Sequence, residues 1–170
     1  MTTRIVSAAL GTVIGIRLLG GTATAQINSA PPTLMGQQSF HLYSVPGVAD
    51  SGGSAPNGVR TFFSCTNTTS ADVLVGVEVF DSGGVALDDA SATSVNIPAG
   101  GTRTFSTGSE LGWPPPVTIL FTGNVNGSAR VLAAAKKGII CSAFMVNGDN
   151  NPPTPTAKLS VVKTTKQKGE

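Results

Sequence analysis

Hydrophobic residues alternate with polar or small residues along much of the chain, and the alternating segments end at clusters of Gly, Pro, Asn, Asp and Ser. A period of two is typical of strands, and such clusters favour turns. The pattern predicts nine strands, at 38–45, 59–65, 73–80, 93–97, 102–107, 117–121, 129–135, 139–146 and 158–164. Short strands at this spacing are typical of an antiparallel β-sandwich.

Residues 129–137 offer an alternative to this pattern. They are rich in helix formers and contain no helix breaker, so a short helix is conceivable there. Turn residues lie close on both sides, which favours a strand. Gly138 followed by two isoleucines predicts a hairpin with arms at 128–136 and 139–145.

The first 25 residues have the features of a secretory signal peptide. Arg4 supplies a positive charge, residues 5–16 carry none, and residues 23–25 are small, so we expect cleavage before Gln26. The apolar stretch is shorter than the roughly 20 residues of a transmembrane helix. The sequence predicts a secreted or periplasmic protein with no stable membrane span in the mature chain. An uncleaved N-terminal anchor is the alternative.

The chain of 170 residues suits a single folded domain. We assign residues 26–36 to a flexible N-terminal segment, residues 37–165 to one β-sandwich domain and residues 166–170 to a basic C-terminal tail. Hydrophobic residues make up 40% of the chain, which argues against a disordered protein.

Acidic and basic residues are segregated along the chain. Residues 26–110 hold two arginines and seven acidic residues, whereas residues 111–170 hold seven basic and two acidic residues. Nucleic-acid-binding proteins usually carry a dense basic stripe, but these basic residues are spread along the whole second segment. We therefore expect no nucleic-acid partner and interpret the charges as a solvated surface.

Two cysteines, Cys65 and Cys141, form an even pair in a chain with an export signal, which favours a disulfide. Each lies within a predicted strand, so we expect the bond to join the two sheets.

Residues suited to catalysis or metal binding are scarce. His41 is the single histidine, whereas an imidazole metal site needs at least two, even beside Cys141 and Met145. A Ser-His-Asp triad would have to use His41, which lies in no nucleophile elbow. We expect no catalytic residue, no metal and no cofactor.

Carboxylates are the remaining candidates. Asp81, Asp88 and Asp89 offer oxygen ligands for calcium, although an acidic turn is more often simply solvated. Glycosidase chemistry needs two facing carboxylates, and nothing in the spacing brings Glu78 and Glu110 together. Glu78 alternates with a row of valines, so we expect it to point to solvent.

Two further motifs lie in predicted turns. Asn67 and Asn126 each begin a glycosylation sequon, which indicates exposed turns. The segment Trp113, Pro114, Pro115 and Pro116 forms a stiff loop, because prolines hold the backbone extended. Trp113 is either a partner contact within this loop or a lid on the core.

Residues 59–107 resemble bacterial immunoglobulin-like domains. The resemblance rests on the strand with Phe63-Ser64-Cys65-Thr66-Asn67, a polar turn, the strand 73–80 and the segment Val95-Asn96-Ile97-Pro98-Ala99-Gly100-Gly101-Thr102. It implies an immunoglobulin-like β-sandwich of about eight or nine strands and a bacterial source. The chain departs from true immunoglobulin domains at Trp113, which lies in a proline loop and not on the strand after the first cysteine.

Two functions remain open. The first is a secreted, non-catalytic β-sandwich protein with a binding, adhesion or structural role, whose partner is an extracellular protein or a surface polymer. The second is a small secreted hydrolase with an unrecognised site. The scarcity of titratable residues favours the first, because acid–base catalysis needs positioned groups with perturbed pKa values.

Overall fold

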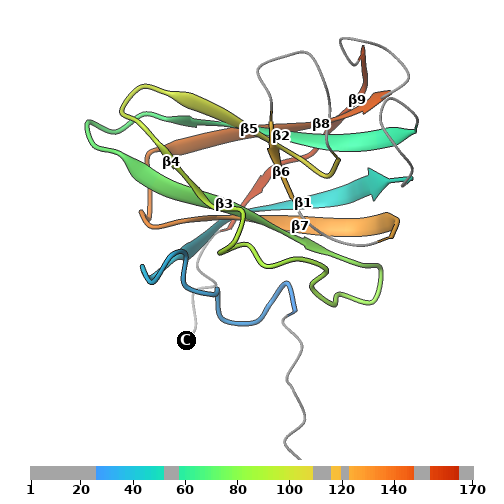
Figure 1. Ribbon diagram of the computed structural model, residues 1–170, viewed down its shortest axis with the longest axis horizontal. Coiled ribbons are helices and arrows are strands. Elements are labelled where there is room, and N and C mark those ends of the chain that lie inside the picture. The colour runs from blue at the N-terminus through green and yellow to red at the C-terminus, as the bar shows by residue number, and fades with distance from the viewer. Residues whose placement is uncertain (1–25, 52–57, 109–115, 120–122, 148–153, 165–170) are drawn as a thin grey trace, which may run out of the picture.

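A computed structural model describes residues 26–51, 58–108, 116–119, 123–147 and 154–164. Within these ranges the chain forms ten strands in two stacked sheets (Figure 1), which confirms the all-β class. The strands are β1 (Phe40–Asp50), β2 (Val59–Asn67), β3 (Val73–Phe80), β4 (Val95–Ile97), β5 (Thr102–Ser106), β6 (Val117–Thr118), β7 (Val125–Ala133), β8 (Ile139–Asn147), β9 (Thr154–Leu159) and β10 (Val162–Lys163). The first sheet has the order β10-β1-β7-β3-β4, and the second has the order β6-β5-β2-β8-β9.

The alternation of apolar residues located most of these strands. β3 spans the predicted range, and β8 ends one residue beyond its predicted end. The predicted strand at 38–45 instead starts at Phe40 and continues to Asp50. The predicted last strand, 158–164, is divided into β9 and β10.

β1 is long because it continues through two bulges, the second of which lies at a Pro-Gly pair. Its pairing with β7 shifts register between His41 and Tyr43 and again between Pro46 and Val48. Gly47 has a φ of 76°, in the left-handed region that glycine adopts without strain. The inward-facing residues are therefore three apart: Leu42, Val45 and Val48. A strict period of two could not predict this spacing.

The expectation of a wholly antiparallel sandwich is wrong at one edge. β6 runs parallel to β5, with Val117 opposite Phe105. The Ile119 amide extends this pairing by donating to the Ser106 carbonyl oxygen at 2.8 Å. A tight turn would have made the two strands antiparallel, but the longer connection lets the chain return in the same direction.

The predicted hairpin of residues 128–145 is also wrong. β7 belongs to the first sheet and β8 to the second, so residues 134–138 cross between the sheets. The crossing is held at both ends by backbone bonds, from the Ala134 amide to Leu74 and from the Thr68 amide to the Gly138 carbonyl oxygen. Gly138, with a φ of 87°, turns the chain here as expected, but toward the other sheet.

Both sheets contribute to one hydrophobic core. Phe63 of β2 and Phe105 of β5 are fully buried against the valines of β3 and the inward face of β7. The predicted inward row of β3 is confirmed: Val73, Val75, Val77 and Val79.

The outer face of β3 is buried as well. Leu74 and Leu132 pack there with Leu34 from the N-terminal segment and Ala90 from the chain after β3. Gly76 allows this close approach, because a Cβ at its position would lie 2.9 Å from the Ala90 carbonyl oxygen. Residues 26–36, expected to be flexible, thus include a fully buried leucine and lie against the first sheet.

Polar contacts also join the two sheets. The Thr61 hydroxyl of β2 donates to the Ala49 carbonyl oxygen of β1 at 2.8 Å, and the Ala49 amide donates back at 3.0 Å. Beside them, Arg60 and Asp50 form a buried ion pair at 2.8 Å. Farther along β1, the Tyr43 hydroxyl donates to the Ile139 carbonyl oxygen of β8 at 2.6 Å.

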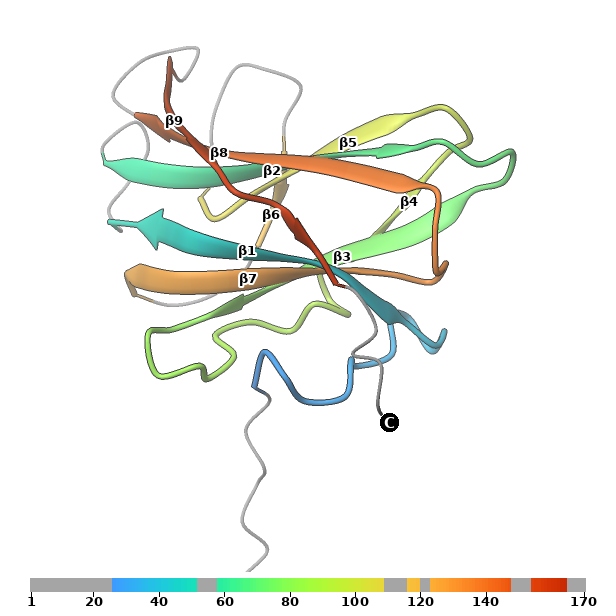
Figure 2. The same cartoon turned by 180° about the vertical axis from the view of Figure 1, so that it is seen from behind.

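The end of the chain bridges the two sheets along one side of the sandwich. β9 pairs with β8 in the second sheet, and β10 pairs with β1 in the first. Figure 2 shows this segment running diagonally from one sheet to the other. We call residues 154–163 the switching segment.

Cys65 and Cys141 form the predicted disulfide, but its expected position is wrong. The two residues are directly opposite each other on β2 and β8, with Cα atoms 4.2 Å apart. The bond therefore joins neighbouring strands of one sheet and does not connect the two sheets. The sequence correctly placed both cysteines within strands but could not indicate that the two strands are neighbours in one sheet.

We predict that reducing this disulfide destabilises the protein without changing its fold. The sequence separation of 76 residues corresponds to about 4.5 kcal/mol in the chain-entropy model. Urea unfolding with and without a phosphine reductant measures the difference, and the double variant Cys65→Ala/Cys141→Ala should match the reduced protein. Thiol titration of the denatured, unreduced protein should give no free thiol; two per chain would contradict the prediction.

Candidate functional site

The outer face of the first sheet holds a buried cluster of ionisable side chains. Arg130 of β7 is opposite Glu78 of β3, and its Nε lies 2.5 Å from the glutamate Oε2. Both side chains are almost completely buried. The expectation that Glu78 points to solvent is therefore wrong. It does alternate with the valines, but the face it points to is covered by other segments.

Arg130 also fastens one of these covering segments. Its Nη1 donates to the carbonyl oxygens of Ser29, at 2.7 Å, and Ile27, at 3.2 Å. Its guanidinium carbon lies 5.3 Å from the ring centroid of Phe80, a cation–π distance. One arginine thus connects β7, β3 and the N-terminal segment.

His41 lies near this cluster, but its surroundings differ from those of a catalytic triad. Its Nε2 is 3.1 Å from both the Ser44 hydroxyl and the Tyr43 carbonyl oxygen. Burial lowers the pKa of His41 below its ordinary value, and the charge of Arg130 lowers it further. A triad needs a carboxylate to stabilise the imidazolium, whereas the charged neighbour that acts on His41 here is a cation.

The three aspartates considered for calcium binding each accept a hydrogen bond from a nearby backbone amide. Asp81 accepts from Val85 and Asp89 from Ser91, both at 2.9 Å, while Asp88 accepts from Val79 at 2.6 Å. These bonds stabilise the turns that follow β3. Within the described ranges, no three or more His, Cys, Asp or Glu side chains are grouped to hold a metal ion.

Asp88 is the most perturbed of these carboxyl groups. Burial, with smaller effects from the charges of Glu78 and Asp89, raises its pKa from 3.8 to about 7. Its Oδ1 accepts the bond from Val79, but its buried Oδ2 has no hydrogen-bond partner among the described residues. Asp88 therefore titrates near neutral pH, in the partly buried segment of chain that follows β3.

The proline loop and the two sequon asparagines are the remaining predicted sites. Trp113, Pro114 and Pro115 lie outside the described residues, while Pro116 is partly buried just before β6. The prediction that Asn67 occupies an exposed turn is wrong, because its side chain is buried and donates to the Ala71 and Ile97 carbonyl oxygens. Asn126 is exposed but lies within β7 and not in a turn.

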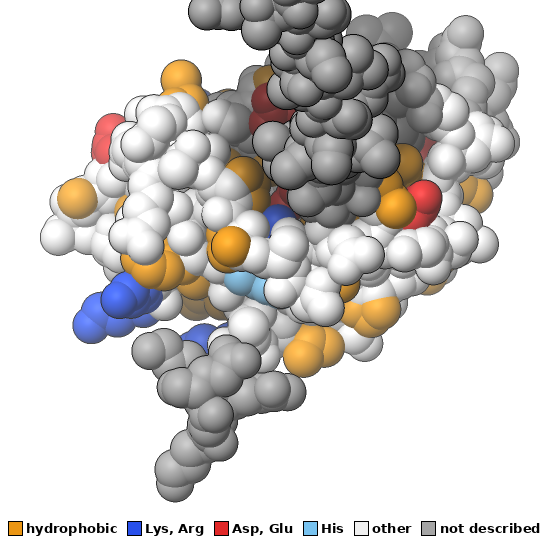
Figure 3. Space-filling view, turned by 90° about the horizontal axis from the view of Figure 1, so that it is seen from below, with side chains coloured by type: hydrophobic (Ala, Val, Ile, Leu, Met, Phe, Trp, Pro, Cys, Tyr) orange, Lys and Arg blue, Asp and Glu red, His pale blue; other side chains and the backbone are white. Residues whose placement is uncertain are grey.

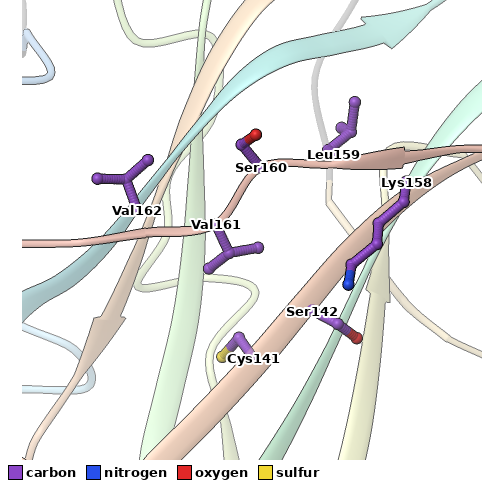
Figure 4. Close-up of a pocket in the computed structure, with 7 residues that line it drawn as sticks. All are labelled: Cys141, Ser142, Lys158, Leu159, Ser160, Val161 and Val162. Atoms are coloured by element: carbon purple, nitrogen blue, oxygen red, sulfur yellow. The ribbon is translucent and has the colours of Figure 1, made fainter.

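A pocket of about 610 Å³ lies away from this polar cluster, next to Cys141 of the disulfide. It is lined by Cys141 and Ser142 of β8 and by residues 158–162 of the switching segment. Figure 4 shows Lys158 and Val161 pointing toward β8, where Ser142 and Cys141 lie. The pocket thus combines a cation, hydroxyl groups and apolar side chains, a combination suited to binding.

The sequence did contain a signal for the buried ion pair. Residues 73–80 are apolar on both faces, because Leu74 and Phe80 share the face of Glu78. Such a continuous apolar strand is typical of one that is covered on both sides. A glutamate there requires a buried cation, and Arg130 also interrupts an apolar strand. The pocket had no comparable signal, because it arises where the last segment changes sheets.

Comparisons of the chain with models of protein families, with curated proteins and with solved structures found no match. In the described part of the chain, no helix is long and apolar enough to cross a membrane. The class of protein is therefore the one that the structure itself defines: a two-sheet β protein with a cross-strand disulfide and a buried ion pair beneath its N-terminal segment.

We predict that Arg130→Met costs about 3–5 kcal/mol of unfolding free energy, because it leaves Glu78 buried without its partner. It should also release residues 26–39 to proteases, since Arg130 holds the Ile27 and Ser29 carbonyl oxygens. Urea unfolding and limited proteolysis measure the two effects. The exposed Arg103→Met is the matched control and should change neither. Adding Glu78→Leu to Arg130→Met should recover most of the stability; no recovery would contradict the prediction.

Asp88→Asn should stabilise the protein at alkaline pH. The pKa of Asp88 is raised on folding, so its contribution to stability is complete below pH 3.8 and is lost as the pH rises through about 7. The amide keeps the acceptor for Val79 and removes the buried charge. We expect the variant to be more stable than the wild type at pH 8.5, by about 2–4 kcal/mol, and nearly equal to it at pH 4. Melting curves at both pH values test this. A constant difference would exclude titration of Asp88 as the cause.

Proposed function

We propose that this is a secreted, non-catalytic β-sandwich protein with a binding, adhesion or structural role outside the cytoplasm. One observation carries the proposal. The ionisable groups that meet on the first sheet, Arg130 and Glu78, are buried, and Arg130 holds the N-terminal segment through the Ile27 and Ser29 carbonyl oxygens. Groups engaged in this way stabilise a rigid framework and are not accessible to a substrate.

Export from the cytoplasm is supported by two independent features. Residues 1–25 have the features of a signal peptide, and Cys65 and Cys141 form a disulfide, a bond that persists in oxidising compartments. The resemblance of residues 59–107 to bacterial immunoglobulin-like domains supports a bacterial, extracellular or periplasmic protein. An immunoglobulin-like arrangement of the strands is part of this proposal.

A small secreted hydrolase is the second candidate, and the contact between Ser44 and His41 favours it. Their side chains lie 3.1 Å apart, within reach for proton transfer. The Nε2 of His41 is shared with the Tyr43 carbonyl oxygen, and Arg130 disfavours a positive charge on the ring. These surroundings oppose the imidazolium that a hydrolase must form.

We predict that protein recovered from the culture medium begins at Gln26 and that it is retained by an extracellular protein or surface polymer of its host. N-terminal sequencing and affinity capture on the immobilised protein test both parts. His41→Ala should capture the same partner as the wild type. Cleavage of a captured polymer or of ester and peptide substrates by the wild type, lost in His41→Ala, would establish the hydrolase instead.

A further inference from the structure

The switching segment crosses one side of the sandwich, from the second sheet to the first. Several partly buried apolar side chains lie on the elements that border this side and pack against the core from there. They are Phe40 and Tyr43 of β1, Ala135, Cys141 of β8, and Leu159 and Val161 of the switching segment. The pocket of about 610 Å³ lies among them, between β8 and residues 158–162. We call this pocket and its borders the notch.

The notch exposes an unpaired edge of β8. β9 pairs with β8 only from Ala143 to Asn147, because the switching segment then turns away toward β1. Residues 139–142 of β8 therefore have no β9 neighbour on that side. In Figure 2 the switching segment diverges from β8 at this point.

The backbone of Cys141 is directed into the notch. Its Cα lies 4.2 Å from that of Cys65, which matches the close spacing of a non-hydrogen-bonded antiparallel pair. In such a pair the N–H and C=O groups point away from the partner strand, so those of Cys141 point away from β2. The Ile139 carbonyl oxygen points the same way, since it accepts from Tyr43. Because the Ile139 carbonyl oxygen is already bonded to Tyr43, the backbone groups that this edge offers to an incoming strand are the N–H and C=O of Cys141.

Basic residues lie in the notch and on the elements next to it. Lys158 lines it, Lys163 follows on β10, and Lys136 and Lys137 lie in the crossing that leads into β8. All four lysines are exposed, and within the described ranges none forms an ion pair with an acidic side chain. The Lys136 ammonium group lies 5.0 Å from the ring centroid of Phe40, so it is held at this side.

Negative charge is absent from the same elements. Residues 134–147 and 154–164 contain no Asp or Glu, and the one acidic residue of β1, Asp50, is paired with Arg60 at its far end. Figure 3, a view from below, shows one group of basic side chains at a border of the molecule and another basic side chain near the centre, beside an acidic one. Among the described residues, the notch therefore has an apolar floor, an open strand edge and a basic rim without acidic partners.

We propose that the notch binds an extended, acidic peptide segment of a partner protein, which adds a strand to the open edge of β8. The backbone of such a segment pairs with Cys141, its apolar side chains contact Val161 and Val162, and its carboxylates meet Lys158 and Lys163. Addition of a strand to a sheet edge is a general mode of peptide recognition. The inference rests on the proposed binding function and names the partner class and its site.

A peptide fits these features better than an acidic polysaccharide or a second copy of the chain. A polysaccharide would use the lysines but has no backbone amides to pair with β8. A second copy would need an acidic, extended edge. Asp50, Glu78 and Asp88 are engaged inside the fold, and the other described acidic residues, Asp72, Asp81 and Asp89, lie outside the strands.

A library of random ten-residue peptides displayed on phage tests the proposal with the purified full chain. We expect the retained peptides to be enriched at least fivefold in Asp and Glu at alternate positions. A fluorescent synthetic copy of one retained peptide then gives the affinity by anisotropy. Hydrogen exchange with the peptide bound should slow at least tenfold at the amide of Cys141. Retained peptides without acidic enrichment, or an unchanged Cys141 amide, would overturn the proposal.

Charge variants locate the site. Lys158→Glu/Lys163→Glu should weaken peptide binding at least tenfold, and the milder Lys158→Gln/Lys163→Gln should weaken it by a smaller factor. Arg103→Glu, an exposed charge reversal on β5, is the matched control and should change binding less than twofold. Equal losses for Arg103→Glu and for Lys158→Glu/Lys163→Glu would indicate nonspecific charge attraction and reject the notch.

The failure of this inference is distinguishable from failure of the proposed function. Dextran sulfate that binds as tightly as the peptide would point to a polymer partner, and a dimer in light scattering that Lys158→Glu/Lys163→Glu dissociates would point to a second copy. Either result rejects the peptide but keeps a binding function. Cleavage of the bound peptide, seen by mass spectrometry, would reject the non-catalytic function itself.

Discussion

The ion pair between Arg130 and Glu78 is the interaction on which the arrangement of the first sheet depends. Two opposite charges in neighbouring strands are stable out of water only when their geometry is good and further hydrogen bonds replace part of their lost hydration. The carbonyl oxygens of Ile27 and Ser29 supply that support from the N-terminal segment. The pair therefore requires the covering segment, and the covering segment in turn lets Leu34 bury the outer face of β3. Removing the ion pair or the N-terminal segment exposes the other to water. The N-terminal segment therefore behaves as part of the folding unit.

The sequence predicted the local structure well where the alternation of apolar and polar residues was not interrupted by a bulge. The alternation of valines in β3 and the polar turns around it are short-range features, and both were located correctly from the residues. β1 departs from this because its bulges turn Leu42, Val45 and Val48 inward at every third position. A bulge adds a residue to the strand without altering its composition, so a pattern of period two ends where the real strand continues.

Pairing between strands was much harder to predict than the strands themselves. Gly138 was recognised as a turn, but the same glycine serves equally well in a hairpin or in a crossing between sheets. The choice depends on contacts far away in the chain, such as the bond from the Thr68 amide to the Gly138 carbonyl oxygen. The disulfide illustrates the same limit, since the partners were evident from composition while their shared sheet was not. The polar cluster was missed because the burial of Glu78 depends on a segment that sequence composition alone indicated to be flexible.

The switching segment shows how one local choice affects both the framework and the surface. By pairing first with β8 and then with β1, it connects the two sheets along one side of the sandwich. A strand that changes sheets cannot cover the full length of either edge, so residues 139–142 of β8 are left without a partner from it. A free edge beside apolar side chains invites nonspecific strand pairing, and charged residues are a general means of preventing it. The lysines around the notch can prevent such pairing between two copies of the protein, because the same side of each copy is positively charged. The same charges repel basic strands and attract acidic ones, so protection against self-association and selectivity for an acidic partner follow from one arrangement.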